Sequence, residues 1–152
     1  MTIIVVCGVL ALLVFFALFS IREHKTERAL ARLRGAQDIS SFAAMFSTDA
    51  ERTIAKVLYP RLEQQASTRE FPLAKEDRLF SPQFGGSILS ESATGYCLRL
   101  LEEDLFDLAI AALTEVGCNA PEIVVADELQ GVESVGQLVT ALGRLTSQPT
   151  AR

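Results

Sequence analysis

Residues 2–21 read TIIVVCGVLALLVFFALFSI and contain no charged side chain. A helix needs roughly 20 predominantly apolar residues to cross a hydrocarbon core about 30 Å thick. Within lipid, a helix also satisfies all of its own backbone hydrogen-bonding groups. The stretch therefore predicts a transmembrane helix over residues 2–21, and we expect the rest of the chain to be attached to a membrane through it.

A cleaved signal peptide is the alternative interpretation of this stretch. Such a peptide has a basic N-terminal region, an apolar core of about 7–15 residues and small residues before the cleavage site. Here residues 1–2 carry no basic side chain, the apolar run is longer, and Ala17-Leu18-Phe19 puts a large residue at its end. The sequence therefore favours a retained anchor.

Basic residues follow the apolar stretch directly. Residues 22–34 hold five Lys or Arg residues against two acidic ones, whereas residues 1–2 have no charged side chain. Because Lys and Arg beside a span are retained on the cytoplasmic side, we expect a single-pass protein with its N-terminus outside and its C-terminal domain cytoplasmic. The helix should continue to Gly35, a natural stop, so that residues 22–46 form a basic juxtamembrane helix and a linker. The five basic residues are Arg22, Lys25, Arg28, Arg32 and Arg34.

The rest of the chain is acidic. The whole sequence has 19 Asp and Glu residues and 14 Lys and Arg residues. Two of the acidic and five of the basic residues lie in 22–34, so residues 36–152 contain seventeen acidic and nine basic residues. Such a domain lacks the positive surface that nucleic-acid binding requires. The basic segment suits anionic headgroups instead. The expected partners are therefore the lipid bilayer and an unidentified protein, and not nucleic acid.

Residues 47–146 are predicted to form one cytoplasmic helical domain, a small bundle. Thr48 and Glu51 have the spacing of a capping box, in which two side chains satisfy backbone donors at a helix start. The helix that they begin should run to about Gln65, with a kink or an end of its regular part at Pro60.

Two further helices are expected in this domain. Residues 102–116 open with acidic side chains, which suit the positive end of a helix dipole, and stop before Gly117. A last helix is expected over about 134–145. Residues 123–125 form too short an apolar run to decide between a buried strand and a helical turn. Residues 147–152 are expected to be a disordered tail.

Two stretches lack a regular pattern. Residues 36–47 are expected to be a linker whose apolar residues Phe42, Met45 and Phe46 pack on the domain. Residues 66–95 contain Pro72, Pro82, Gly85, Gly86 and Gly95 and are expected to be a long loop. The apolar segments expected to hold this loop against the core are 71–73 and 79–80.

No metal or cofactor site is expected. His24 is the only histidine and has no other ligand at metal-binding spacing. Three consecutive carboxylates at residues 102–104 point in different directions on a helix, so they favour a helix start over a cation site. Gly85-Gly86-Ser87 could be taken for a phosphate-binding loop, but no lysine follows Lys75, and such a loop needs one.

The sequence also predicts no enzyme activity. No cysteine, serine or lysine has an identifiable base beside it along the chain. Cys7 lies in the predicted span, and Cys97 and Cys118 would face a reducing compartment, where we expect them to be small core residues rather than a disulfide.

The order of segments over residues 48–146 resembles the acyl carrier protein fold. The resemblance rests on the loop PLAKEDRL (72–79), the acidic-started helix that closes on Val116-Gly117, a proline-containing connection and the final VESVGQLV (132–139). It implies a carrier-like helical bundle. In carriers a serine at the start of the second helix holds phosphopantetheine, and here Leu105 stands at that position, which would lie at the exposed mouth of the helix.

A second alignment to carriers places the attachment at Ser87. The segment FGGSI (84–88) is similar to the glycine-glycine-x-serine of peptide-synthetase carriers but lacks the intervening residue. The sequence thus predicts a mostly α protein that is a single-pass, membrane-anchored, non-enzymatic interaction or scaffold module without a cofactor. The alternative is a membrane-tethered acyl or peptidyl carrier modified at Ser87 or Ser90.

Overall fold

The computed structural model describes residues 2–66, 71–80 and 96–147, and in its first helix it describes only part of the side chains, from Leu10 onward. Within these ranges there is no strand, only isolated bridges that join Arg78 to Cys97 and to Ser134. The expected mostly helical fold with a helical bundle is therefore confirmed. The helices are α1 (Thr2–Arg34), α2 (Ile39–Ala44), α3 (Asp49–Gln65), α4 (Glu102–Glu115), α5 (Glu122–Glu128) and α6 (Val135–Ser147).

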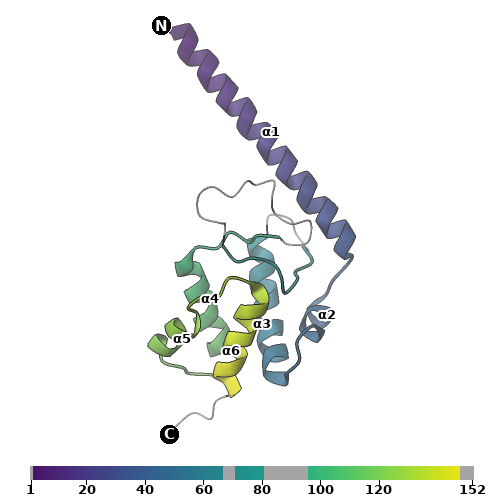
Figure 1. Ribbon diagram of the computed structural model, residues 1–152, viewed down its shortest axis with the longest axis vertical. Coiled ribbons are helices and arrows are strands. Elements are labelled where there is room, and N and C mark those ends of the chain that lie inside the picture. The colour runs from purple at the N-terminus through teal and green to yellow at the C-terminus, as the bar shows by residue number, and fades with distance from the viewer. Residues whose placement is uncertain (1, 67–70, 81–95, 148–152) are drawn as a thin grey trace.

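The first helix, α1, is a long rod that leaves the bundle and carries the N-terminus away from it (Figure 1). It ends as expected at Gly35, which has a φ of 77° and donates its N–H to Ala31 O at 3.1 Å. A positive φ is easy only for glycine, so the residue type at this position sets the end of the helix. Among the residues that the structure describes, no helix is both long enough and apolar enough to traverse a membrane.

The third helix, α3, begins at the predicted capping box. Glu51 N–H donates to Thr48 Oγ1 (3.1 Å), and Thr48 N–H donates back to Glu51 Oε2 (3.0 Å). The helix continues through Pro60 and ends at Gln65, so the proline does not terminate it.

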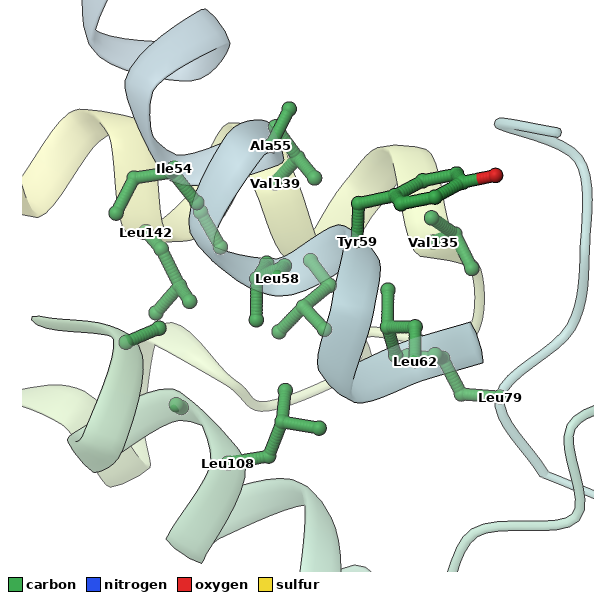
Figure 2. Packing of buried hydrophobic residues seen from close by; sticks show 14 of the residues in the cluster. Ile54, Ala55, Leu58, Tyr59, Leu62, Leu79, Leu108, Val135, Val139 and Leu142 are labelled. Atoms are coloured by element: carbon green, nitrogen blue, oxygen red, sulfur yellow. The ribbon is translucent and has the colours of Figure 1, made fainter. Parts of the chain in front are cut away.

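The core of the bundle lies around α3, which packs against α2, α4 and α6. Figure 2 shows Leu58 of α3 and Leu108 of α4 pointing toward one another, with Leu142 of α6 beside them. Leu79, from the loop before α4, lies next to Leu62 at the end of α3 (Figure 2). Leu79 thus holds its loop against the core, as the sequence predicted, and Phe71 and Leu73 are buried in the same way.

A short helix, α2, occupies the region that was expected to be a linker. Asp38 caps it, because Ser41 N–H donates to Asp38 Oδ1 at 2.7 Å. Phe42 and Phe46 are buried against the bundle, as predicted, whereas Met45 is exposed. The chain therefore folds onto the bundle almost directly after α1.

The C-terminal helices resolve what the sequence left open. Residues 123–125 are helical and belong to α5. The last helix, α6, is preceded by a second reciprocal cap: Gln137 N–H donates to Ser134 Oγ (3.3 Å), and Ser134 N–H donates to Gln137 Oε1 (3.1 Å). The helix extends to Ser147, two residues beyond the expected end, and the remainder of the predicted tail lies outside the described residues.

Glu51 also joins α3 to α6. Its Oε1 accepts a hydrogen bond from the Thr140 hydroxyl at 3.0 Å. One turn further along α6, Gly143 faces Glu51, and a Cβ added there would lie 2.9 Å from Glu51 Cγ and 3.3 Å from its backbone N. A glycine at this position therefore permits the close approach of the two helices.

We expect the Glu51 contacts to make the bundle sensitive to acid. The Thr48 N–H holds the pKa of Glu51 below its ordinary value of 4.5, and the Thr140 hydroxyl adds to this effect, while partial burial opposes it. A carboxylate with a lowered folded-state pKa contributes stability above its unfolded pKa, and that contribution is lost as pH falls through the folded value. In urea titrations, wild type should therefore have a larger free energy of unfolding than Glu51→Gln at pH 7, and this difference should shrink below pH 4.5. Exposed Glu76→Gln should show no such trend; equal trends would contradict the assignment.

Candidate functional site

Three segments meet beside the end of α1, and we call them the hub: residues 75–79, 96–100 and 133–136. The middle of the first segment is paired on both sides by backbone hydrogen bonds of 2.7–2.9 Å. On one side Arg78 N–H donates to Tyr96 O, and on the other Val135 N–H donates to Asp77 O. These bonds hold Asp77 at the centre of the hub.

Asp77 is the only fully buried charged residue among those described, with an exposed fraction of 0 %. Its two carboxylate oxygens accept hydrogen bonds from Arg34 Nη1 at 2.7 Å and from Arg34 Nη2 at 2.5 Å, so the two residues form a bidentate ion pair. They also accept from the backbone N–H groups of Ala74 (2.7 Å) and Tyr96 (2.9 Å). A buried charge is tolerated when it is paired and its lone pairs are satisfied, and both conditions hold here.

Arg34 is the last residue of α1, so this ion pair ties the long helix to the hub. Its Nη1 also donates to Pro72 O at 2.7 Å, and its guanidinium lies 5.5 Å from the centre of the Phe71 ring. The centres of the Phe71 and Tyr96 rings are 4.2 Å apart. The Tyr96 hydroxyl in turn donates to Glu27 Oε1 at 3.0 Å, two turns earlier on α1. We call the two pairs, Arg34–Asp77 and Glu27–Tyr96, the lock.

The lock corrects one part of the sequence interpretation. The sequence groups Arg34 with the basic juxtamembrane residues that suit anionic headgroups, but its guanidinium is largely buried against Asp77. The run Lys75-Glu76-Asp77-Arg78 is typical of an exposed loop, and no local signal distinguishes Asp77 from its neighbours. Only the hydrogen bonds between distant segments bring these two charges together.

A second candidate is an open groove of about 510 Å³ beside α5 and α6. Lys75 Nζ lies 4.5 Å from the centre of the Phe46 ring there. Arg144 Nη1 and Glu128 Oε1 form an ion pair at 3.0 Å, but their geometry does not meet that of a hydrogen bond. None of the described residues that line the groove is a cysteine, serine or histidine. The groove thus offers charges of both signs.

The candidate sites predicted from the sequence are not brought together. Gly85, Gly86, Ser87 and Ser90 lie outside the described residues, as do the side chains of His24 and Cys7. Cys97 is buried and Cys118 is half-buried, and the two do not form a disulfide with each other. The core-residue expectation therefore holds for Cys97 and in part for Cys118.

Leu105 is also not where a carrier's attachment residue would be. Its exposed fraction is 4 %, and it packs within the core cluster. The exposed position expected at the start of this helix is therefore not observed. Residues 102–104 are exposed at the first turn of α4, as expected for a helix start. Among the described residues, no group of three or more His, Cys, Asp or Glu side chains could hold a metal ion.

The lock thus joins side chains of α1 to two segments of the hub. Comparison of the chain with known protein families, with curated proteins and with solved structures finds no match in any of the three.

Proposed function

We propose that this chain is a membrane-anchored, non-enzymatic interaction module, in which the apolar part of α1 lies in a bilayer and the bundle is presented on the cytoplasmic side. The observation that carries the proposal is the exposed apolar surface of α1. It includes four consecutive residues, 12–15, so it runs around the helix rather than along one face. Within residues 10–21, the large apolar side chains that the structure describes and that are more than half exposed are Leu10, Leu12, Leu13, Val14, Phe15, Leu18 and Ile21.

This surface is unfavourable in water. Each Å² of exposed apolar area costs about 25 cal/mol relative to burial, and soluble proteins rarely leave large contiguous apolar patches uncovered. A helix that is apolar all round is typically buried in a large core or in a membrane. The bundle does not cover these residues, and the sequence of 2–21 continues the same character toward the N-terminus.

The lock supports the role of an interaction module. The charged end of α1 is joined to the hub at two points, Glu27 and Arg34, so the bundle is held in a fixed orientation relative to the helix. A rigid connection presents the same faces of the bundle to a partner at all times. The groove, which is lined by charges of both signs, supports a binding role.

Membrane attachment is tested by alkaline washing of membranes from cells that express the full chain. We expect wild type to stay in the membrane pellet and the Leu13→Arg, Val14→Arg double variant to be released, because each arginine at the centre of a span costs about 2.5–3.5 kcal/mol. Equal release of both proteins would contradict the anchor.

Orientation and the carrier alternative have separate tests. A reporter that works only in the cytoplasm should be active when fused after Arg152, and activity only from a reporter specific to the opposite side would reverse the orientation. Co-expression with a phosphopantetheinyl transferase should leave the intact mass unchanged. An added phosphopantetheine on Ser87 or Ser90 would replace our proposal with the carrier alternative.

A further inference from the structure

We infer that Lys25, Arg28 and Arg32 form a binding surface for the headgroups of anionic lipids, which we call the basic stripe. This inference rests on the proposed membrane anchor and names the lipid class that the segment after it recognises. It is carried by the register of these residues on α1, by the lock on the opposite face, and by their distance from the apolar stretch.

The three residues share one face of α1. At 100° per residue, positions 25, 28 and 32 fall within about 60° of one another around the helix. All three side chains are exposed, and no described residue forms an ion pair with any of them. Their charges are therefore available to an external anion.

The lock turns this face away from the bundle. Glu27, Leu30, Ala31 and Arg34 are partly buried on the side of α1 that meets the hub. The basic stripe lies roughly 140° around the helix from the centre of that side. Because Glu27 and Arg34 are both bonded to the hub, α1 cannot rotate to bring the basic stripe onto the acidic bundle.

The position along α1 places the stripe at the level of the headgroups. A helix rises 1.5 Å per residue, so Lys25 and Arg28 lie about 6 Å and about 10 Å beyond Ile21, and Arg32 lies about 16 Å beyond it. The headgroup layer extends about 5–8 Å beyond the hydrocarbon on each side. Long side chains can reach back toward it, so Lys25 and Arg28 should contact headgroups, and Arg32 should act only through space, over about a Debye length.

Charge also selects the type of lipid. Residues 36–152 carry seventeen acidic against nine basic side chains, so an anionic leaflet would repel the bundle. The basic stripe is the exposed cationic surface nearest the apolar stretch among the described residues, and it opposes this repulsion locally. Zwitterionic headgroups would neither repel the bundle nor gain much from the stripe.

The test uses the full chain in nanodiscs of equal phosphatidylglycerol and phosphatidylcholine at low salt. The measured quantity is the association of spin-labelled phosphatidylglycerol relative to spin-labelled phosphatidylcholine. We expect Lys25→Gln and Arg28→Gln each to lower this ratio about threefold to fivefold, as expected for a cation beside an anionic surface. Arg32→Gln should lower it less than about twofold. Lys56→Gln, which removes the same charge from the exposed side of α3, should leave it unchanged.

Each outcome bears on a different claim. A ratio near one for wild type, or equal losses for Lys56→Gln and Lys25→Gln, would overturn the inference. Flotation of the full chain with vesicles of pure phosphatidylcholine tests the anchor separately. Flotation without any preference for phosphatidylglycerol would contradict lipid binding by the basic stripe and support the anchor. A failure to float would contradict both proposals.

Discussion

Asp77→Ala is expected to lower the free energy of unfolding of the bundle by about 3–5 kcal/mol, because breaking a buried ion pair leaves an uncompensated charge. The substitution removes the acceptor for four hydrogen bonds at once, from Arg34, Ala74 and Tyr96. Arg34 would keep its bond to Pro72 O but would lose its countercharge. Thermal unfolding of the detergent-solubilised full chain, followed by circular dichroism, measures the loss.

Arg61→Ala provides the control for this prediction. Arg61 Nη2 lies 2.7 Å from Glu115 Oε2, a similar distance, but both side chains are substantially exposed. Exposed pairs contribute about 0–1 kcal/mol, so this variant should be nearly neutral. Arg34→Lys keeps the charge but not the two-pronged geometry, and it should fall between the two. If Asp77→Ala cost no more than Arg61→Ala, the lock would have no energetic importance.

Phe42→Ala should be similarly costly, about 3–5 kcal/mol, because truncating a buried aromatic side chain leaves a large cavity. Phe42 is fully buried, and its ring centre lies 5.4 Å from that of Phe46 and 5.1 Å from that of Tyr59. It is the main anchor of α2 on α3. The same thermal unfolding experiment measures its contribution.

Met45→Ala is the matched control for Phe42→Ala, because Met45 lies directly after α2 but 41 % of its surface is exposed. We expect a change of less than about 0.5 kcal/mol for it. A small effect of both substitutions would mean that α2 is only loosely attached and is not a part of the bundle.

Local chemistry made much of this fold predictable. The capping pair Thr48 and Glu51 marks the start of α3, and Gly35 and Gly117 mark two helix ends where the backbone takes a positive φ. Each of these signals depends only on residues a few positions apart. Helices with such boundaries and a regular apolar stripe can therefore be located without knowledge of their neighbours.

Features that depend on distant segments were not predictable in this way. The second helix, α2, is too short to show a periodic pattern, and it owes its place to the burial of Phe42. The two pairs of the lock join residues 43 and 69 positions apart, and the burial of Asp77 follows from the backbone pairing of the hub. The analogy to carriers implied an exposed Leu105, whereas the helical spacing of Leu105 with Leu108 and Leu113 correctly puts it on the apolar face of α4 that packs in the core.

The hub has a consequence for the order in which the protein folds during synthesis. The N–H of Leu79 is paired with Glu133 O, and the carbonyl of Asp77 is paired with Val135 N–H, more than fifty residues later. Until residue 135 has left the ribosome, these groups have no partner and the bundle lacks α6. Such long-range pairing forms slowly, because loop closure comes before the contacts that stabilise it. Residues 2–21 emerge much earlier, so an anchor would reach a translocation channel while the bundle is still unfolded. Ribosome-bound chains stalled before residue 135 should accordingly be sensitive to protease over α3 and α4.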